Sequence, residues 1–365
     1  MKYTSSSAAE EKHPGISTTD THSQDALPEV EMGFVDDVLL PTNQFQKWSV
    51  QLETMLGMEA RGIQRVPEEL RRGKTGTADY IQMCLIWFSA NVTANNTLLG
   101  LLGPLLFDVG LKDGMIIACC GAFCGAAASG YISTFGPASG CRTLVIARFT
   151  MGWWPSRLCV ALNIVIMVGY GLVDMLLTGQ ILSAVNGGGM TVIVGTIISA
   201  IVTLIICLFG MKLFHTYERY AFIPQLIVLL ILVGCAGPYW DASTPTEGPN
   251  DVAVADRMSF FFLCMSGCLA WAAASADFYV YFPADANRWK VWTSTTLGLG
   301  GACAFTYVIG VGIASGVANN SAWAAANDNS TGALMDAVFA PLGSFGHFCS
   351  VVVALGLIAN KSVLP

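Results

Sequence analysis

Charged residues are scarce in this sequence and unevenly distributed. Asp, Glu, Lys and Arg make up 12% of its 365 residues, which is about half the usual share in soluble domains. Residues 1–79 hold 13 of the 25 acidic and 8 of the 18 basic residues, so residues 80–365 carry only 22 charged side chains. With 54% hydrophobic residues and a mean hydropathy of +0.58, this composition excludes an ordinary soluble protein and favours an integral membrane protein.

The motifs of common enzymes are also missing. The sequence has no G-x-S-x-G, no H-E-x-x-H and no phosphate-binding loop, which argues against an enzyme and against transport driven directly by ATP within the chain. Twelve cysteines are present, but almost all lie in apolar runs, where a thiol acts as a small hydrophobe. No His stands near them to complete a metal site, and no basic patch suggests nucleic acid. We expect no cofactor, no metal and no nucleic-acid partner.

Eight apolar segments are each long enough to cross a bilayer as a helix, which takes about 20 residues. They are too long for strands and lack the alternation of strands. The predicted helices are residues 81–107, 115–135, 157–184, 190–214, 220–240, 259–282, 291–316 and 333–360. The sequence therefore predicts an all-α integral membrane protein in contact with the lipid bilayer.

Lysine and arginine predict the orientation of these helices. With the N-terminal tail inside, the internal loops contain seven basic residues and the external loops two. The internal residues are Arg142, Arg148, Arg157, Lys212, Arg219, Arg288 and Lys290, and the external ones are Lys112 and Arg257. We expect a multi-pass plasma-membrane protein with a cytoplasmic N-terminus.

Two of the predicted helices contain stretches that do not suit a continuous helix. The first holds "FSANVTANNT" (88–97), with six polar side chains at bilayer depth. The sixth holds "WAAASADFYVYFP" (271–283), where small residues lead to an acid and a proline. The two interrupted helices are five helices apart in the chain. This spacing is typical of transporters built from two inverted five-helix repeats, which have a substrate site near the midplane of the membrane. For either stretch alone, close packing of small residues is the alternative explanation.

Residues in and near these stretches are candidates for a binding site. Ser89 and Asn91 lie in the first stretch, and Trp271 lies deep in the sixth helix, where it is placed to stack on a flat ligand. In the third helix Asp174 stands near mid-membrane, with Tyr170 one turn before it on the same face. A membrane-buried acid is costly unless protonated or paired, so a functional role is the default interpretation. The alternative is a neutral Asp174 hydrogen-bonded to a neighbouring helix.

Two further ionisable residues are weaker candidates. Asp277 lies farther toward the cytoplasm than Trp271, so we expect it to cap a half-helix or to pair with a base such as Arg288. His347 lies near the outer third of the eighth helix and is a weaker candidate for carrying a proton.

Four longer motifs resemble those of fungal purine–cytosine permeases, a branch of the nucleobase–cation symporter family. They are "RGIQRVPEELR" (61–71), "FSANVTANNTLLGLLGP" (88–104), "FGMKLFHTYERYAFIP" (209–224) and "WAAASADFYVYFP" (271–283). The resemblance runs from about residue 30 to residue 360. It implies a leucine-transporter-like fold of two inverted five-helix repeats and proton-coupled uptake of cytosine and purine bases.

The resemblance also implies roles for single residues in the first, third, sixth and eighth helices. Tyr170 stands where the family often has a tryptophan, and Asp174 where an asparagine is expected. Because an acid replaces an amide donor, vitamin B6 or a related heterocycle is an alternative substrate. Ala354 and Leu355 lie where sodium-coupled relatives carry hydroxyl residues, which favours proton coupling, with Asp174 as the coupling residue. The residues implied as substrate-binding are Ser89, Asn91, Tyr170, Asp174, Trp271 and Asn360.

The predicted domain organisation follows from the number of helices. Residues 1–79 form a cytoplasmic tail, residues 80–240 the first repeat with helices one to five, and residues 259–365 an incomplete second repeat with helices six to eight. Because two helices of that repeat are missing from the eight, we expect residues 1–365 alone to be a truncated permease that is poorly folded or inactive. A channel or receptor is less favoured, since the sequence shows neither pore-lining polar periodicity nor a ligand-binding domain.

Overall fold

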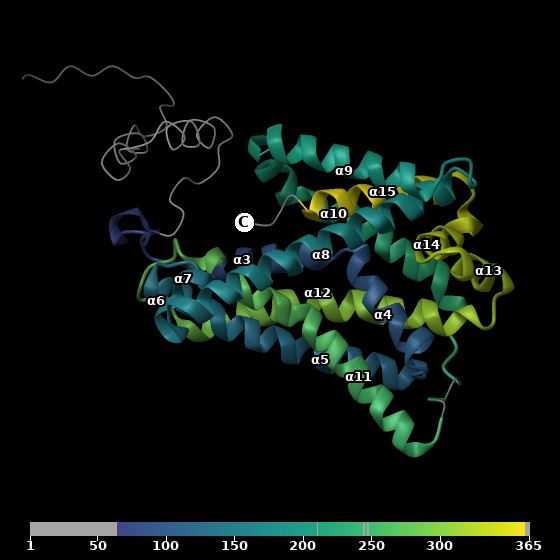
Figure 1. The fold of residues 1–365 in the computed structure, drawn as a ribbon, viewed down its shortest axis with the longest axis horizontal. Coiled ribbons are helices and arrows are strands. Elements are labelled where there is room, and N and C mark those ends of the chain that lie inside the picture. Colours follow the sequence, from purple (N-terminus) through teal and green to yellow (C-terminus); the bar gives the residue numbers. More distant parts are fainter. Residues whose placement is uncertain (1–63, 210, 244, 247, 362–365) are drawn as a thin grey trace, which may run out of the picture. The chain divides into compact units, whose positions relative to one another are not determined.

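The computed structural model describes residues 64–209, 211–243, 245–246 and 248–361 (Figure 1), and for residues 207–222 and 359–361 it describes no side chains. All of these residues lie in one compact unit of the chain, Glu53–Pro365. Regular structure in the described part is helical throughout, as predicted. Residues 1–63 of the predicted N-terminal tail lie outside the described residues.

The first predicted helix is divided in two, as its polar stretch indicated. It consists of α3 (Thr77–Asn91) and α4 (Ala94–Leu106), preceded by a single 3₁₀ turn, η1 (Glu68–Leu70). The rest of the N-terminal half comprises α5 (Leu111–Ser133), the short α6 (Phe135–Ser139) and α7 (Thr143–Met151), α8 (Trp153–Val185), α9 (Val192–Phe209), α10 (Met211–Ala236) and η2 (Gly237–Tyr239).

The sixth predicted helix is also divided. It begins as α11 (Asn250–Leu269) and continues as two 3₁₀ turns, η3 (Ala270–Ala273) and η4 (Asp277–Tyr279). The chain then forms α12 (Arg288–Val317), α13 (Ser321–Asn329), α14 (Thr331–Phe339), η5 (Ala340–Leu342) and α15 (Ser344–Lys361).

The prediction of one continuous eighth helix over residues 333–360 is wrong. The chain leaves the α-helix after Phe339, passes through η5 and restarts at Ser344. Pro341 has no N–H to donate to a helix, and Gly343 adopts the left-handed region with φ 56°, which glycine reaches without steric cost. These two residues together explain the interruption.

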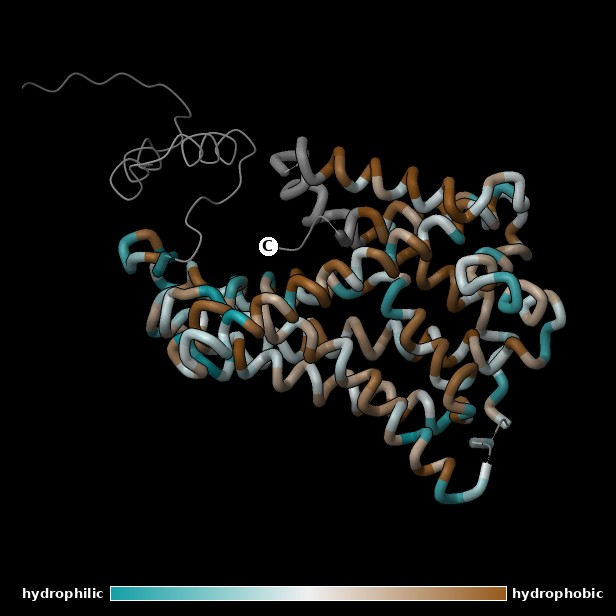
Figure 2. The backbone as a smooth tube through the Cα atoms, in the orientation of Figure 1, coloured by the Kyte–Doolittle hydropathy of each residue, from teal (hydrophilic) through white to brown (hydrophobic). Residues whose placement is uncertain are grey.

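Four helical segments of the described chain are long and apolar enough to cross a membrane. They are Leu111–Ser139, Trp153–Val185, Asn250–Ala273 and Arg288–Val317. Four shorter apolar helices accompany them, at Val192–Ile206, Ile223–Tyr239, Thr331–Leu342 and Ser344–Ile358. Figure 2 shows hydrophobic residues along α8 and α9 and hydrophilic ones mainly in connecting segments, and both helices expose many large apolar side chains. This distribution suits a surface that faces lipid.

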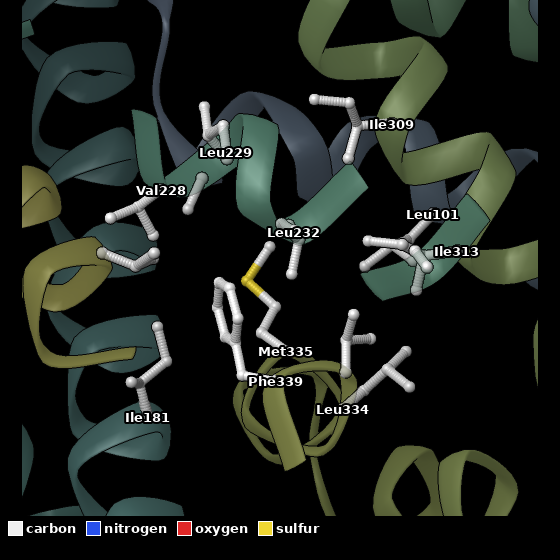
Figure 3. Packing of buried hydrophobic residues seen from close by; sticks show 14 of the residues in the cluster. Leu101, Ile181, Val228, Leu229, Leu232, Ile309, Ile313, Leu334, Met335 and Phe339 are labelled. Atoms are coloured by element: carbon white, nitrogen blue, oxygen red, sulfur yellow. The ribbon is translucent and has the colours of Figure 1, made fainter. Parts of the chain in front are cut away.

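A buried apolar cluster joins helices from both halves of the sequence (Figure 3). The cluster contains Leu101 of α4, Ile181 of α8, Leu232 of α10, Ile313 of α12 and Met335 of α14. A second cluster packs α3 and α5 against α11 and α12. In both clusters α12 is the shared element, and it forms the centre against which α3 and α4 are held, whereas α11 packs mainly on α5.

The contact between α4 and α12 depends on two glycines. A Cβ atom at Gly100 would collide with the Tyr307 carbonyl oxygen, and one at Gly310 with that of Thr97. Small residues allow this close approach of two backbones. The start of α4 is therefore fixed tightly beside α12, which positions the break between α3 and α4.

Candidate functional site

The break in the first divided helix is short and stabilised by its own side chains. Val92 (ψ 74°) and Thr93 (φ −133°, ψ 154°) leave helical geometry, and α4 begins immediately after them. Asn96 Nδ2 donates a hydrogen bond of 2.7 Å to the Asn91 carbonyl oxygen, and Asn91 Nδ2 donates one of 3.0 Å to the Trp87 carbonyl oxygen. Backbone groups freed by the break need such partners inside a membrane protein, which explains why asparagine is frequent here.

The break in the sixth predicted helix is longer, and hydrogen bonds attach it to a different part of the chain. Asp277 Oδ1 accepts hydrogen bonds from the Thr143 backbone N–H at 2.6 Å and from its hydroxyl at 2.9 Å. The Thr143 Oγ1 in turn accepts one from the Ala276 backbone N–H at 3.0 Å. Thr143 is the first residue of α7, so Asp277 caps that helix, where a negative charge is favoured. The carboxylate thus has a capping role, at α7 rather than at a half-helix.

A cavity of about 60 Å³ lies between the two breaks and the middle of α8. It is small and partly open, and its lining combines polar side chains of the first break with apolar surface from one face of α8, the end of α11 and the start of η3. The residues that line it are Asn91, Thr93, Asn95, Asn96, Met167, Tyr170, Asp174, Gly267, Ala270 and Trp271. Residues widely separated in the sequence therefore converge on one space beside the interrupted backbone.

Four of the six residues expected to bind substrate line this cavity: Asn91, Tyr170, Asp174 and Trp271. Asp174 is only 2% exposed and contributes to the wall of the space from α8. Ser89 lies half-buried on α3 and is not among the lining residues. Asn360 belongs to the last turn of α15, and its side chain is outside those that the structure describes.

The ring of Trp271 is held by other aromatic side chains. The Trp87 ring meets it edge-on, with centroids 5.5 Å apart and planes at 86°, and the Phe278 ring lies 6.4 Å away. Trp87 and Phe278 are themselves 4.6 Å apart. Edge-to-face contacts of this kind are favourable and directional, so the half-buried indole is held at the cavity wall by neighbours on α3 and the η4 segment.

Sequence reasoning missed several lining residues. Asn95 and Asn96 belong to the polar stretch that predicted the break, so a signal for them was present. Met167 was also detectable, because it precedes Tyr170 and Asp174 by one and two turns on the same face of α8. The lining residues not predicted individually are Thr93, Asn95, Asn96, Met167, Gly267 and Ala270.

Cys303 of α12 contacts two asparagines of the first break. Its sulfur lies 3.9 Å from both Asn96 Nδ2 and Asn91 Oδ1, at the outer limit for hydrogen bonds to sulfur. The side chain is 1% exposed. This buried position gives Cys303 a structural role, as expected for a cysteine in an apolar run. Among the described residues, no group of three or more potential metal ligands occurs.

Comparison with known proteins identifies relatives along nearly the whole chain. Residues 65–361 match the family described as permease for cytosine/purines, uracil, thiamine and allantoin. The vitamin B6 transporter TPN1 of Saccharomyces cerevisiae is 28% identical over 321 residues, 87% of this chain and 55% of its own length. The purine-cytosine permease fcyB of Emericella nidulans is 29% identical over 357 residues, 96% of this chain and 67% of its own. The chain thus spans between about half and two thirds of the length of these relatives.

Two solved structures share the fold. The inward-facing conformation of Mhp1 superimposes with a TM-score of 0.62 at 14% identity, covering 83% of this chain and 66% of Mhp1. A closed conformation of Mhp1 with bromovinylhydantoin bound gives a TM-score of 0.58 at 13% identity, covering 84% and 67%. The expected leucine-transporter-like, all-helical architecture is therefore confirmed at the level of the fold.

The family match and the apolar helices agree that this is a multi-pass membrane protein of a permease family and not an enzyme. The chain belongs to the nucleobase–cation symporter family, among the permeases for cytosine/purines, uracil, thiamine and allantoin.

Proposed function

We propose that this protein imports purine bases and cytosine by proton symport across the plasma membrane, with its N-terminus in the cytoplasm. Residues 80–240 and 259–365 belong to the two inverted repeats of this transporter. The single observation that supports the proposal is the convergence of both helix breaks and the acid-bearing face of α8 on one cavity. Substrate sites of transporters with this architecture lie where the broken helices meet.

The side chains of the cavity suit a flat heterocycle with polar edges. Trp271 offers an aromatic face on which a base stacks, and such stacking is insensitive to which base is present. The amides of Asn91, Asn95 and Asn96 offer both donors and acceptors to the ring edge. Stacking from one side and hydrogen bonds around the edge are the combination by which single bases are recognised.

Asp174 supplies a carboxyl group that can gain or lose a proton beside the bound substrate. A protonated carboxyl donates to a ring nitrogen or carbonyl group, whereas an ionised carboxylate only accepts, for example from an exocyclic amine. Asp174 is almost completely buried at the cavity wall, and ionisable residues in this setting commonly form proton relays. In the proposed mechanism Asp174 therefore binds the substrate and carries the coupled proton.

A vitamin B6 compound is the second candidate substrate. Its support is the similarity to TPN1 together with an acid where the resemblance leads us to expect an asparagine. A carboxylate accepts hydrogen bonds from hydroxyl groups as well as from amines. The same stacking on Trp271 applies to a pyridine ring.

Uptake of radiolabelled cytosine and adenine in cells lacking their own nucleobase permeases tests the proposal. Transport by this chain would appear as saturable uptake that rises with external acidity and is inhibited by unlabelled bases more strongly than by pyridoxine, whereas an inactive truncated permease would show no uptake. Stronger inhibition by pyridoxine would replace the nucleobase with vitamin B6. If there is no uptake, equilibrium binding to the purified protein is measured instead, since an inactive fragment with an intact cavity binds substrate without transporting it. Absence of binding to any of these compounds would contradict the proposal.

A further inference from the structure

A second and larger cavity lies between the beginnings of α3 and α12. It has a volume of about 400 Å³ and is open to the surface. One wall is a single face of α3, with Tyr80, Ile81 and Cys84 at helical spacing. The other wall is a face of α12, with Lys290, Ser294 and Leu297. None of these residues lines the cavity at the helix breaks, so this groove is a separate feature of the molecule.

The groove is polar at one end and apolar at the other. Lys290 lies in the first turn of α12, with its Nζ 5.5 Å from the centroid of the Tyr80 ring, and the neighbouring Trp289 is 75% exposed. Farther along the two helices, Ile81 is 57% exposed and Leu297 54% exposed. A tryptophan and a lysine at the end of an apolar surface are typical of the membrane–water interface. The groove therefore runs from that interface along the lipid-facing surface.

Basic residues outnumber acidic ones at the polar end. Residues 72–80 and 284–290 contain the bases Arg72, Lys74, Arg288 and Lys290 and the acids Asp79 and Asp285. Asp79 already interacts, with its Oδ1 3.6 Å from Arg72 Nη1 and its Oδ2 accepting from the Gly76 N–H at 2.8 Å. Of these charged residues Lys290 lines the groove itself, so its polar end carries the positive charge of Lys290 within segments that hold more bases than acids.

We propose that this groove binds one anionic phospholipid, with its phosphate beside Lys290 and an acyl chain along Ile81, Cys84 and Leu297. Charge complementarity favours an anionic over a zwitterionic headgroup, and the linear apolar channel between two helices fits an acyl chain. Anionic lipids are concentrated in the cytoplasmic leaflet, which is the leaflet in which the positive-inside rule places this end of the helices. The proposal concerns the membrane and not the transported substrate, so it stands or falls independently of the proposed function.

Native mass spectrometry of the purified chain in a neutral detergent measures the binding directly. The probes are phosphatidylserine and phosphatidylcholine with identical acyl chains, and a sterol as a third ligand without a phosphate. We expect phosphatidylserine to bind more tightly than either of the others. Lys290→Gln should weaken phosphatidylserine binding about fivefold, the effect of one basic residue near an anionic headgroup, and leave phosphatidylcholine binding unchanged.

Two further variants keep the experiment decisive. Lys112→Gln removes the same charge at an exposed position near the start of α5, away from this groove, and should change nothing. Leu297→Trp fills the apolar end and should weaken binding of both phospholipids. Equal binding of phosphatidylserine and phosphatidylcholine to the unmodified chain, preference for the sterol, or equal effects of Lys290→Gln and Lys112→Gln would each overturn the proposal.

Discussion

The two helix breaks differ in length and in what holds them. The first occupies Val92 and Thr93 and is stabilised locally, by hydrogen bonds from the asparagines that flank it. The break in the sixth helix extends over residues 270–279. It is attached through Asp277 to α7, which lies in the connection between α5 and α8. The first break also lies against α12, where glycines bring the backbones close together.

This difference indicates a division of roles between the breaks. The first is held rigidly beside α12 and presents amide groups to the cavity, which suits recognition of a ligand edge. The break in the sixth helix presents an aromatic face, and it is tied to Thr143 at the start of α7 by Asp277 and by the Ala276 N–H. We therefore expect a change in the break of the sixth helix to affect the start of α7, and a change in the break of the first helix to remain local.

The largest expected effect comes from breaking the attachment of the sixth break. Asp277→Ala removes the two hydrogen bonds that Thr143 donates, one from its backbone N–H and one from its hydroxyl. It therefore leaves the N-terminus of α7 uncapped. We expect the free energy of unfolding of the purified protein to fall by about 2 kcal/mol. Asp285→Ala removes an exposed acid from the same segment and is the control in the same unfolding experiment. An equal loss in both variants would show that the capping interaction is unimportant.

Removing the aromatic face should weaken substrate binding without destabilising the fold to the same extent. Stacking of a base on an aromatic ring is worth about 1–3 kcal/mol, so Trp271→Ala should raise the dissociation constant for adenine or cytosine at least tenfold. Trp154→Ala, at a position 75% exposed on α8, should leave it unchanged. If both variants bind as the unmodified protein does, Trp271 does not contact the substrate.

A smaller effect is expected from the local support of the first break. Asn96→Ala deletes the 2.7 Å hydrogen bond to the Asn91 carbonyl oxygen, one amide bond worth about 1 kcal/mol. Because Asn96 also lines the cavity, the variant removes one amide from the substrate edge as well, and binding should weaken about fivefold, which corresponds to about 1 kcal/mol for one hydrogen bond. The mobility of α7, followed by hydrogen exchange, should not change. Increased exchange in α7 would contradict the division of roles between the two breaks.

The smallest effect at any single pH is expected for Asp174→Asn. The amide keeps a donor and an acceptor at the cavity wall but does not titrate, so binding should persist while its pH dependence disappears. The inhibition constant of the substrate, measured at several pH values for both forms, gives the two curves. If the curves keep the same slope, the proton is carried by another group and Asp174 is a structural hydrogen-bonding residue.

The sequence predicted those features that depend on local composition. Polar and small residues at bilayer depth predicted both breaks, and the spacing of Tyr170 and Asp174 predicted the α8 face of the cavity. It did not predict the division between α14 and α15, because Pro341 and Gly343 were included in one apolar run. Gly267, Ala270 and the support by Cys303 could not be foreseen either, since their positions depend on how α11 and α12 pack against the first break.

The central claim is that the space between the two breaks is where the substrate binds. Ala270 lines that space, and Ala270→Leu fills part of it, while Ala161→Leu makes the same change at an exposed position of α8. Equilibrium binding of radiolabelled adenine and cytosine to the purified protein measures the consequence. We predict at least about tenfold weaker binding for Ala270→Leu, because overfilling a packed site forces costly rearrangement, and no change for Ala161→Leu. Undiminished binding by folded Ala270→Leu would contradict the claim and place the substrate elsewhere in the protein.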